Sequence, residues 1–226
     1  MAEDWYRSKI WSAEIEEAFF KKLKRCRSQG PQNLVIQALT LARIEPKVTL
    51  RLLDHYFVTN DQFDQSRAFC TQAQAFETLG CLDEAVEAYR RALEWEKSHP
   101  GMISNAWIDL PYLIATRSLR SHFELAIKIL QSGQNGLIFH SQSFVYSVSL
   151  ALIYWQTGQK ALARKLAEQA VDAASIKKPQ LPRHKNVGLV GPEAAVDLDR
   201  MKRIIDEKNP FIRGPVERLK GWLKRD

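Results

Sequence analysis

The chain has 226 residues, of which 45% are hydrophobic and 26% charged, and its formal net charge is +7. This ordinary globular composition is sufficient for one well-cored domain or for a continuous solenoid. No apolar run approaches the roughly 20 residues that cross a bilayer, which argues against a membrane-spanning protein.

The first residues, Met-Ala-Glu-Asp-Trp-Tyr, are acidic and aromatic, and so do not resemble a secretory signal. The three cysteines lack metal-ligand spacing, and their odd number predicts reduced thiols at Cys26, Cys70 and Cys81. We therefore expect a cytoplasmic protein without a metal or cofactor.

Residues 4–28 are predicted to form one long amphipathic helix that ends at Gly30 and Pro31. Its apolar residues recur at helical spacing, at Trp5, Ile10, Trp11, Ile15, Phe19, Phe20 and Leu23. Acidic residues come first and basic residues last on its other face, an order that suits the helix dipole. The basic run 21–27 is thus interpreted as an exposed helix end, with phosphate contact as the alternative. A weaker helical hairpin is predicted at residues 33–44 and 46–57.

The clearest pattern in the chain lies at residues 67–100. Small and aromatic residues fall at helical spacing on either side of a turn around Gly80, which predicts two helices joined as a hairpin. One such hairpin cannot bury its own apolar face, so further copies are expected.

A second copy is predicted at residues 144–174 and a worn copy at residues 103–134. The key alanines of the three copies are Ala85, Ala126 and Ala163, separated by 41 and 37 residues. The worn copy carries Pro111 in its first helix, which predicts a kink with a cost of about 3 kcal/mol.

The stretch 67–100 resembles the tetratricopeptide repeat, a helix–turn–helix unit of about 34 residues. The matching residues are Phe69, Ala73, Phe76, Gly80, Ala85, Tyr89 and Ala92. The stretch departs from the family at Gln72, where a leucine is usual, and at Pro100, which comes three residues late. The resemblance implies an all-α fold, a tetratricopeptide-like α–α superhelix (solenoid) with an N-terminal helix and a C-terminal capping segment.

Two regions are expected. Residues 1–175 would hold the N-terminal helix and three to four helical hairpins. Residues 176–226 would form a basic extension and cap packed on the solenoid, because they hold 13 basic and 7 acidic residues. Within the extension we expect a strand-like segment at 186–192 and helices at 193–207 and 215–223. Its first part contains a possible basic patch at Lys177, Lys178, Arg183, His184 and Lys185.

Signatures of catalysis are missing from the sequence. The segment Gly188-Leu-Val-Gly191 lacks the third glycine of a phosphate loop, and no CxxC pair or HExxH occurs. No serine lies in a Gly-x-Ser-x-Gly elbow. We therefore expect a protein that is not an enzyme.

In tetratricopeptide proteins the first helices of the repeats line a concave groove that commonly holds a partner peptide or helix. The resemblance implies the groove residues Arg67, Cys70, Gln74, Glu77, Ile108, Tyr112, Val145, Val148, Leu152 and Trp155. The family's clamp for a C-terminal carboxylate uses lysine and asparagine at these places, so that clamp is not expected here. An apolar groove end with Trp155 suits an amphipathic helix.

Three functions are compatible with the sequence. The leading one is a non-enzymatic protein–protein interaction module or adaptor. The first alternative is an immunity or antitoxin protein that neutralises a toxic partner, by analogy with compact bacterial repeat chains. The second alternative is a nucleic-acid-associated protein that uses the basic C-terminal segment.

Overall fold

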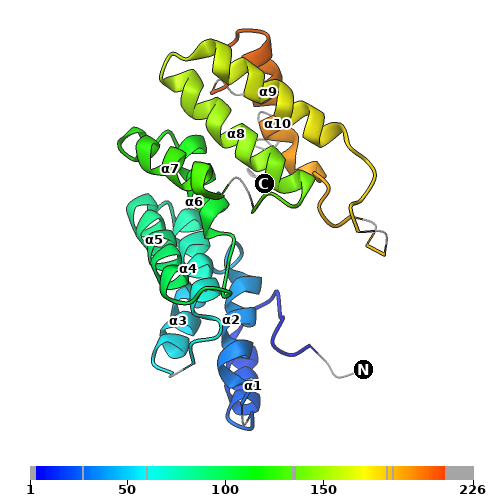
Figure 1. The fold of residues 1–226 in the computed structure, drawn as a ribbon. Coiled ribbons are helices and arrows are strands. Elements are labelled where there is room, and N and C mark those ends of the chain that lie inside the picture. Colours follow the sequence, from blue (N-terminus) through cyan, green and yellow to red (C-terminus); the bar gives the residue numbers. More distant parts are fainter. Residues whose placement is uncertain are drawn as a thin grey trace, which may run out of the picture. The chain divides into compact units, whose positions relative to one another are not determined.

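A computed structural model describes residues 4–26, 28–59, 61–133, 136–181, 183–184 and 186–211. Ten α-helices connected by turns and short 3-10 helices make up these residues, which contain no β-strand (Figure 1). The all-α prediction is therefore confirmed. The chain divides into two compact units, Met1–Ala106 and Trp107–Asp226.

Unit 1 consists of a leading helix and two helix pairs. Its helices are α1 (Ala13–Leu23), α2 (Gly30–Leu41), α3 (Pro46–Phe57), α4 (Gln65–Leu79) and α5 (Leu82–Ser98). The helices of each pair, α2 with α3 and α4 with α5, pack against each other. Helix α4 also packs on α3 and α2, so the second pair stacks on the first. This stacking buries the apolar face that a single hairpin leaves exposed.

Unit 2 is built around one tightly packed helix pair. Its helices are α6 (Ala106–Thr116), which begins at the unit boundary, α7 (Phe123–Gly133), α8 (His140–Gln156), α9 (Lys160–Ser175) and α10 (Ala195–Ile205). Helices α8 and α9 form a tightly packed pair, and α10 packs on α9 and α8 just as α4 packs on α3 and α2. Helix α10 thus takes the place of the first helix of a further pair.

Two glycines make the sharp turns of the best-formed pairs. Gly80 ends α4 with φ 80°, and Gly158 follows α8 with φ 83°, a left-handed conformation that costs other residues about 1 kcal/mol or more. The amide after each glycine returns to the helix, Cys81 N to Phe76 O and Gln159 N to Tyr154 O, each at 2.9 Å. Such returning bonds satisfy carbonyls at the end of a helix.

Alanines occupy the interfaces where two helices approach closely. The alanines of α5 and α9 at these places are fully or almost fully buried: Ala85, Ala88, Ala92, Ala163, Ala167 and Ala170. Tyr89 fills the remaining space in the first of these pairs, with 2% of its surface exposed. The small residues of the repeat pattern therefore allow the helices to approach closely, and the large ones fill the space that remains between them.

The prediction of one helix over residues 4–28 is wrong. Helix α1 begins only at Ala13, after Ser12 has adopted an extended conformation and accepted a hydrogen bond from the Ile15 amide at 3.3 Å. A straight helix would separate residues 5 and 19 by about 21 Å. Instead the chain folds back, and the rings of Trp5 and Phe19 lie 5.3 Å apart. Packing of the aromatic side chains therefore overrides the helical periodicity.

The worn copy forms two helices, α6 and α7. Pro111 lies inside α6 and is buried. A Cβ on Gly133, the last residue of α7, would lie far inside van der Waals contact with the Trp107 ring. The absence of a side chain at Gly133 therefore allows the end of α7 to lie against the start of α6.

The segment expected to be strand-like at 186–192 is a turn instead, which corrects that prediction. Gly188 has φ 81° and lies against the Phe139 ring, and its carbonyl accepts a hydrogen bond from Ser141 N at 2.9 Å. Gln180 adds a bond from His140 N to its side-chain oxygen at 3.0 Å. Gly188 and Gln180 thus each satisfy one amide of the first turn of α8. The helix predicted at 215–223 lies outside the described residues.

Candidate partner-binding surfaces

The four groove residues predicted in α4 differ in their accessibility. Arg67 is exposed and forms an ion pair of 2.8 Å with Asp64, while Gln74 is half-buried. Glu77 is also half-buried and accepts a hydrogen bond from Tyr89 OH at 2.9 Å. Cys70 is buried, so of the four predicted residues only Arg67, Gln74 and Glu77 have appreciable exposed surface.

A polar network that sequence reasoning missed fixes the start of α4. The Glu96 carboxylate accepts hydrogen bonds from Ser66 Oγ at 2.5 Å and from Ser104 N at 2.8 Å. The Cys70 thiol lies 3.1 Å from Ser104 Oγ. The network joins α4, the end of α5 and the following loop. Because its members lie up to 38 positions apart in the sequence, no local sequence pattern predicts the network.

Asp64, which directly precedes α4, is a buried acidic residue. Its side chain is 2% exposed, and its Oδ2 accepts no hydrogen bond within the described part of the chain. Burial raises the pKa of Asp64 above its ordinary value, although Arg67 acts in the opposite direction and Asp61 reinforces the rise. The folded state therefore binds a proton at Asp64 more readily than the unfolded state does.

This raised pKa predicts a specific pH dependence. As the pH rises through the ordinary pKa and then the folded pKa of Asp64, the folded state loses free energy relative to the unfolded state. Wild type is therefore expected to gain stability relative to Asp64→Asn when the pH is lowered from 7 to about 4, near the ordinary pKa of an aspartate. Urea denaturation of both proteins at the two pH values measures this difference. A loss for wild type on acidification would indicate a lowered pKa and contradict the expectation.

In unit 2 the structure corrects several predicted groove residues. Val148 and Leu152 have no exposed surface and Ile108 is 4% exposed, so all three belong to the interior. Val145 and Trp155 are half-buried. Of the predicted residues of α8, only these two reach the surface.

Tyr112, the remaining predicted groove residue, is engaged within unit 2. Its hydroxyl donates a hydrogen bond of 2.5 Å to Asp197 Oδ2 on α10. Asp197 is 6% exposed and also forms an ion pair of 3.2 Å with Arg200. Tyr112 therefore connects α6 to α10, a role that its sequence position does not reveal.

Trp155 borders a hollow of about 530 Å³ beside the turn between α8 and α9. The hollow is lined by Trp155, Lys160, Ala161, Arg164, Ile204 and Glu207. The Lys160 ammonium lies 3.1 Å from the Trp155 ring centroid, and the resulting loss of water lowers its pKa. Arg164 lies between Glu168 at 3.3 Å and Glu207 at 3.6 Å. The hollow combines an aromatic wall with charged groups that are already paired.

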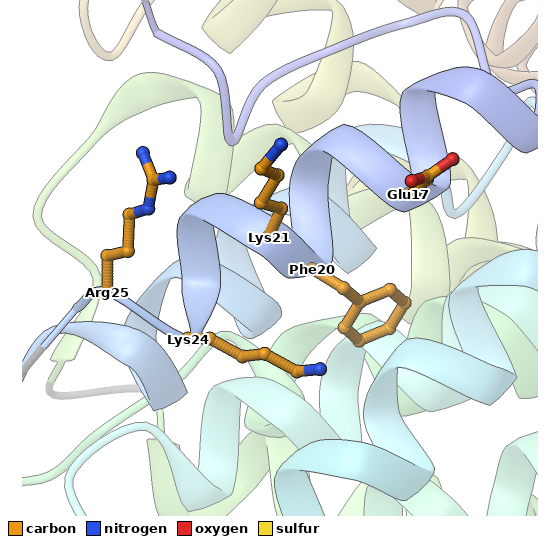
Figure 2. A pocket seen from close by; sticks show the side chains of 5 residues that line it. All are labelled: Glu17, Phe20, Lys21, Lys24 and Arg25. Carbon is orange, nitrogen blue, oxygen red and sulfur yellow. The ribbon is translucent and has the colours of Figure 1, made fainter.

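A second hollow, of about 480 Å³, lies at the end of α1. It is lined by Glu17, Phe20, Lys21, Lys24 and Arg25 (Figure 2). Lys24 extends on the side of the Phe20 ring, whereas Lys21 and Arg25 project from another side of the helix. We call this surface the α1 basic hollow. The sequence predicted its charges but not its concave shape.

The possible basic patch in the C-terminal segment is exposed where it is described. Lys177, Lys178, Arg183 and His184 all face solvent, and Lys185 lies outside the described residues. Lys177 Nζ donates to Ala174 O at 3.3 Å, which places one of these charges at the end of α9. A cation there suits the helix dipole.

Across the described part of the chain, no helix is long and apolar enough to span a membrane. No group of three or more histidine, cysteine or acidic side chains is arranged there to hold a metal ion.

Within each unit these helices form the stacked pairs of a helical-repeat protein. The family model of the tetratricopeptide repeat matches residues 66–99 and 146–176. These matches coincide with α4/α5 and α8/α9, so the chain carries two tetratricopeptide repeats, as its sequence predicts. A search of curated proteins and a search of solved structures each found no match to the chain.

Proposed function

We propose that the chain is a non-enzymatic interaction module that binds a peptide or helix of a partner protein. The observation that supports this proposal is the presence of two tetratricopeptide repeats folded as helix pairs. Repeats of this family generally mediate protein–protein interaction. Stacked helix pairs present side chains of their first helices to such partners.

The proposed contact residues are those predicted side chains that reach the surface and are not held inside a unit. In α4 they are Arg67, Gln74 and Glu77, and in α8 they are Val145 and Trp155. Trp155 is the expected anchor, because large aromatic side chains at the rim of a hollow often dominate interface energies. The ammonium of Lys160 above its ring would move aside at small cost, since lysine is flexible and exposed.

The proposal predicts one stoichiometric protein partner whose capture survives high salt. The full chain serves as bait in native lysate, with a wash at about 0.5 M salt, where charges are screened within a few Å. Trp155→Ala and Gln74→Arg are each expected to weaken capture about tenfold or more. Gln169→Arg is the matched control, because Gln169 is exposed on the second helix α9.

Equal loss in all three variants, or no loss in any, would contradict the proposed contact residues. Retention of nucleic acid alone, and only at low salt, would overturn the protein-binding function itself. Purified partner and bait are then mixed and weighed by native mass spectrometry to establish the stoichiometry. Circular dichroism of each variant shows whether the helices remain intact.

A further inference from the structure

We infer that the α1 basic hollow binds an acidic segment of a protein partner, one that carries carboxylates next to a large apolar side chain. The inference depends on the proposed function only in that the partner is a protein. Its residues, Lys21, Lys24 and Arg25 with Phe20, are separate from the contact residues proposed on α4 and α8.

The charge of the hollow is the first support. Lys21, Lys24 and Arg25 are exposed, and Glu17 is the only acidic residue among the five that line the hollow. Within the described residues these three cations form no ion pair, in contrast to exposed Arg51, which pairs with Glu16 at 2.8 Å.

The three cations gather at one end of the helix. Lys21 lies in the last turn of α1, Lys24 caps the helix and Arg25 follows it, and all three line the same hollow. Like charges brought this close repel one another, and a bound carboxylate would relieve the repulsion. The chain therefore holds a positive charge cluster that an external anion complements.

Phe20 gives the hollow an apolar wall of fixed position. The ring is half-buried and packs edge-on against Phe19 at 5.5 Å and His55 at 4.9 Å. Lys24 lies four residues beyond Phe20, and Figure 2 shows both on the same side of α1. A ligand with an apolar side chain beside a carboxylate would contact both groups at once.

A protein fits this site better than a nucleic acid does. The hollow lies at the C-terminal end of α1, so it lacks the free backbone amides with which a helix N-terminus binds phosphate. Nucleic-acid affinity also requires many phosphate contacts along a track, whereas five residues line this hollow. Lysine and arginine bind single carboxylates as well as phosphates, so the small extent of this hollow is what favours a short acidic peptide segment.

The test is a selection of random peptides displayed on phage, performed on the full chain at about 0.15 M salt, where the Debye length is ~8 Å. Selected peptides are expected to be enriched in aspartate and glutamate beside leucine or an aromatic residue. Their affinities are then measured by fluorescence anisotropy. In Lys24→Glu/Arg25→Glu, peptide affinity should fall about tenfold or more.

A matched control separates the site from general electrostatics. Arg43→Glu/Lys47→Glu changes the net charge equally at exposed positions of the same unit, and it should leave affinity within about twofold. Equal losses in both double variants would overturn the inference, as would peptides without acidic enrichment. Phe20→Ala keeps all charges of the hollow and removes only the ring. An unchanged peptide affinity in that variant would show that the ring does not contact the peptide and would contradict the inferred apolar contact.

Two further outcomes are decisive. Single-stranded polyuridylate that binds through Lys24 and Arg25, while acidic peptides do not, would assign the hollow to nucleic acid and overturn the inference. Acidic peptides that bind independently of Lys24 and Arg25, but require Trp155 or Gln74, would retain the proposed function and reject this site. Circular dichroism confirms that α1 and the rest of the fold persist in each variant.

Discussion

Leu152→Ala is expected to lower the free energy of unfolding of unit 2 by about 2–5 kcal/mol, the usual cost of emptying a fully buried leucine site. Leu152 has no exposed surface and lies in the middle of α8, which packs along α9. Hydrogen exchange of α8 and α9 amides, followed by mass spectrometry, measures the effect within unit 2. Exchange should become faster throughout both helices.

The matched control for this change is Val145→Ala. Val145 lies two turns earlier on the same helix and is half-buried, so its truncation is expected to cost less than about 1.5 kcal/mol. If Leu152→Ala instead left hydrogen exchange unchanged and only weakened partner capture, the leucine would be a groove residue. The experiment thus separates a packing role from a binding role at one position.

Leu152 also shows where sequence reasoning reaches its limit. The repeat pattern locates α8 and α9 correctly, because alanine spacing and the glycine turn are local properties. Whether a given side chain of α8 remains open depends on what packs against it later in the chain. Helix α10 packs on α8 and α9, and Asp197 from α10 binds Tyr112. Neither of these two long-range contacts can be predicted from the sequence of α8 itself.

The α1 basic hollow shows the same contrast between features that a local sequence pattern predicts and features that depend on long-range packing. Lys21, Lys24 and Arg25 are evident in the sequence as a basic run at a helix end. The packing of Phe20 against His55 joins α1 to α3, across 35 positions, and no periodicity predicts it. The predicted helix 4–28 includes residues 5 and 6, because Trp5 continues the helical spacing of the apolar residues. Their contribution to the aromatic cluster around Phe19 required a chain reversal instead.

Asp197→Ala is expected to destabilise unit 2 by about 3 kcal/mol, because it removes an acceptor that two groups share inside the fold. Tyr112 OH donates to its Oδ2 at 2.5 Å, and Arg200 pairs with its Oδ1 at 3.2 Å. A double-mutant cycle with Tyr112→Phe should give a coupling energy of about 1–3 kcal/mol. Urea denaturation supplies the four free energies, and hydrogen exchange locates the effect on α10.

Asp199→Ala is the control for this cycle, since Asp199 lies two positions further on α10 and is half-buried. Its cost should stay below about 1 kcal/mol, within the range of exposed charges. Additive effects of Tyr112→Phe and Asp197→Ala would show that the hydrogen bond contributes nothing. A clear coupling would instead mean that Tyr112 stabilises the position of α10. The residue expected to meet a partner would then act by holding together the unit that carries Trp155.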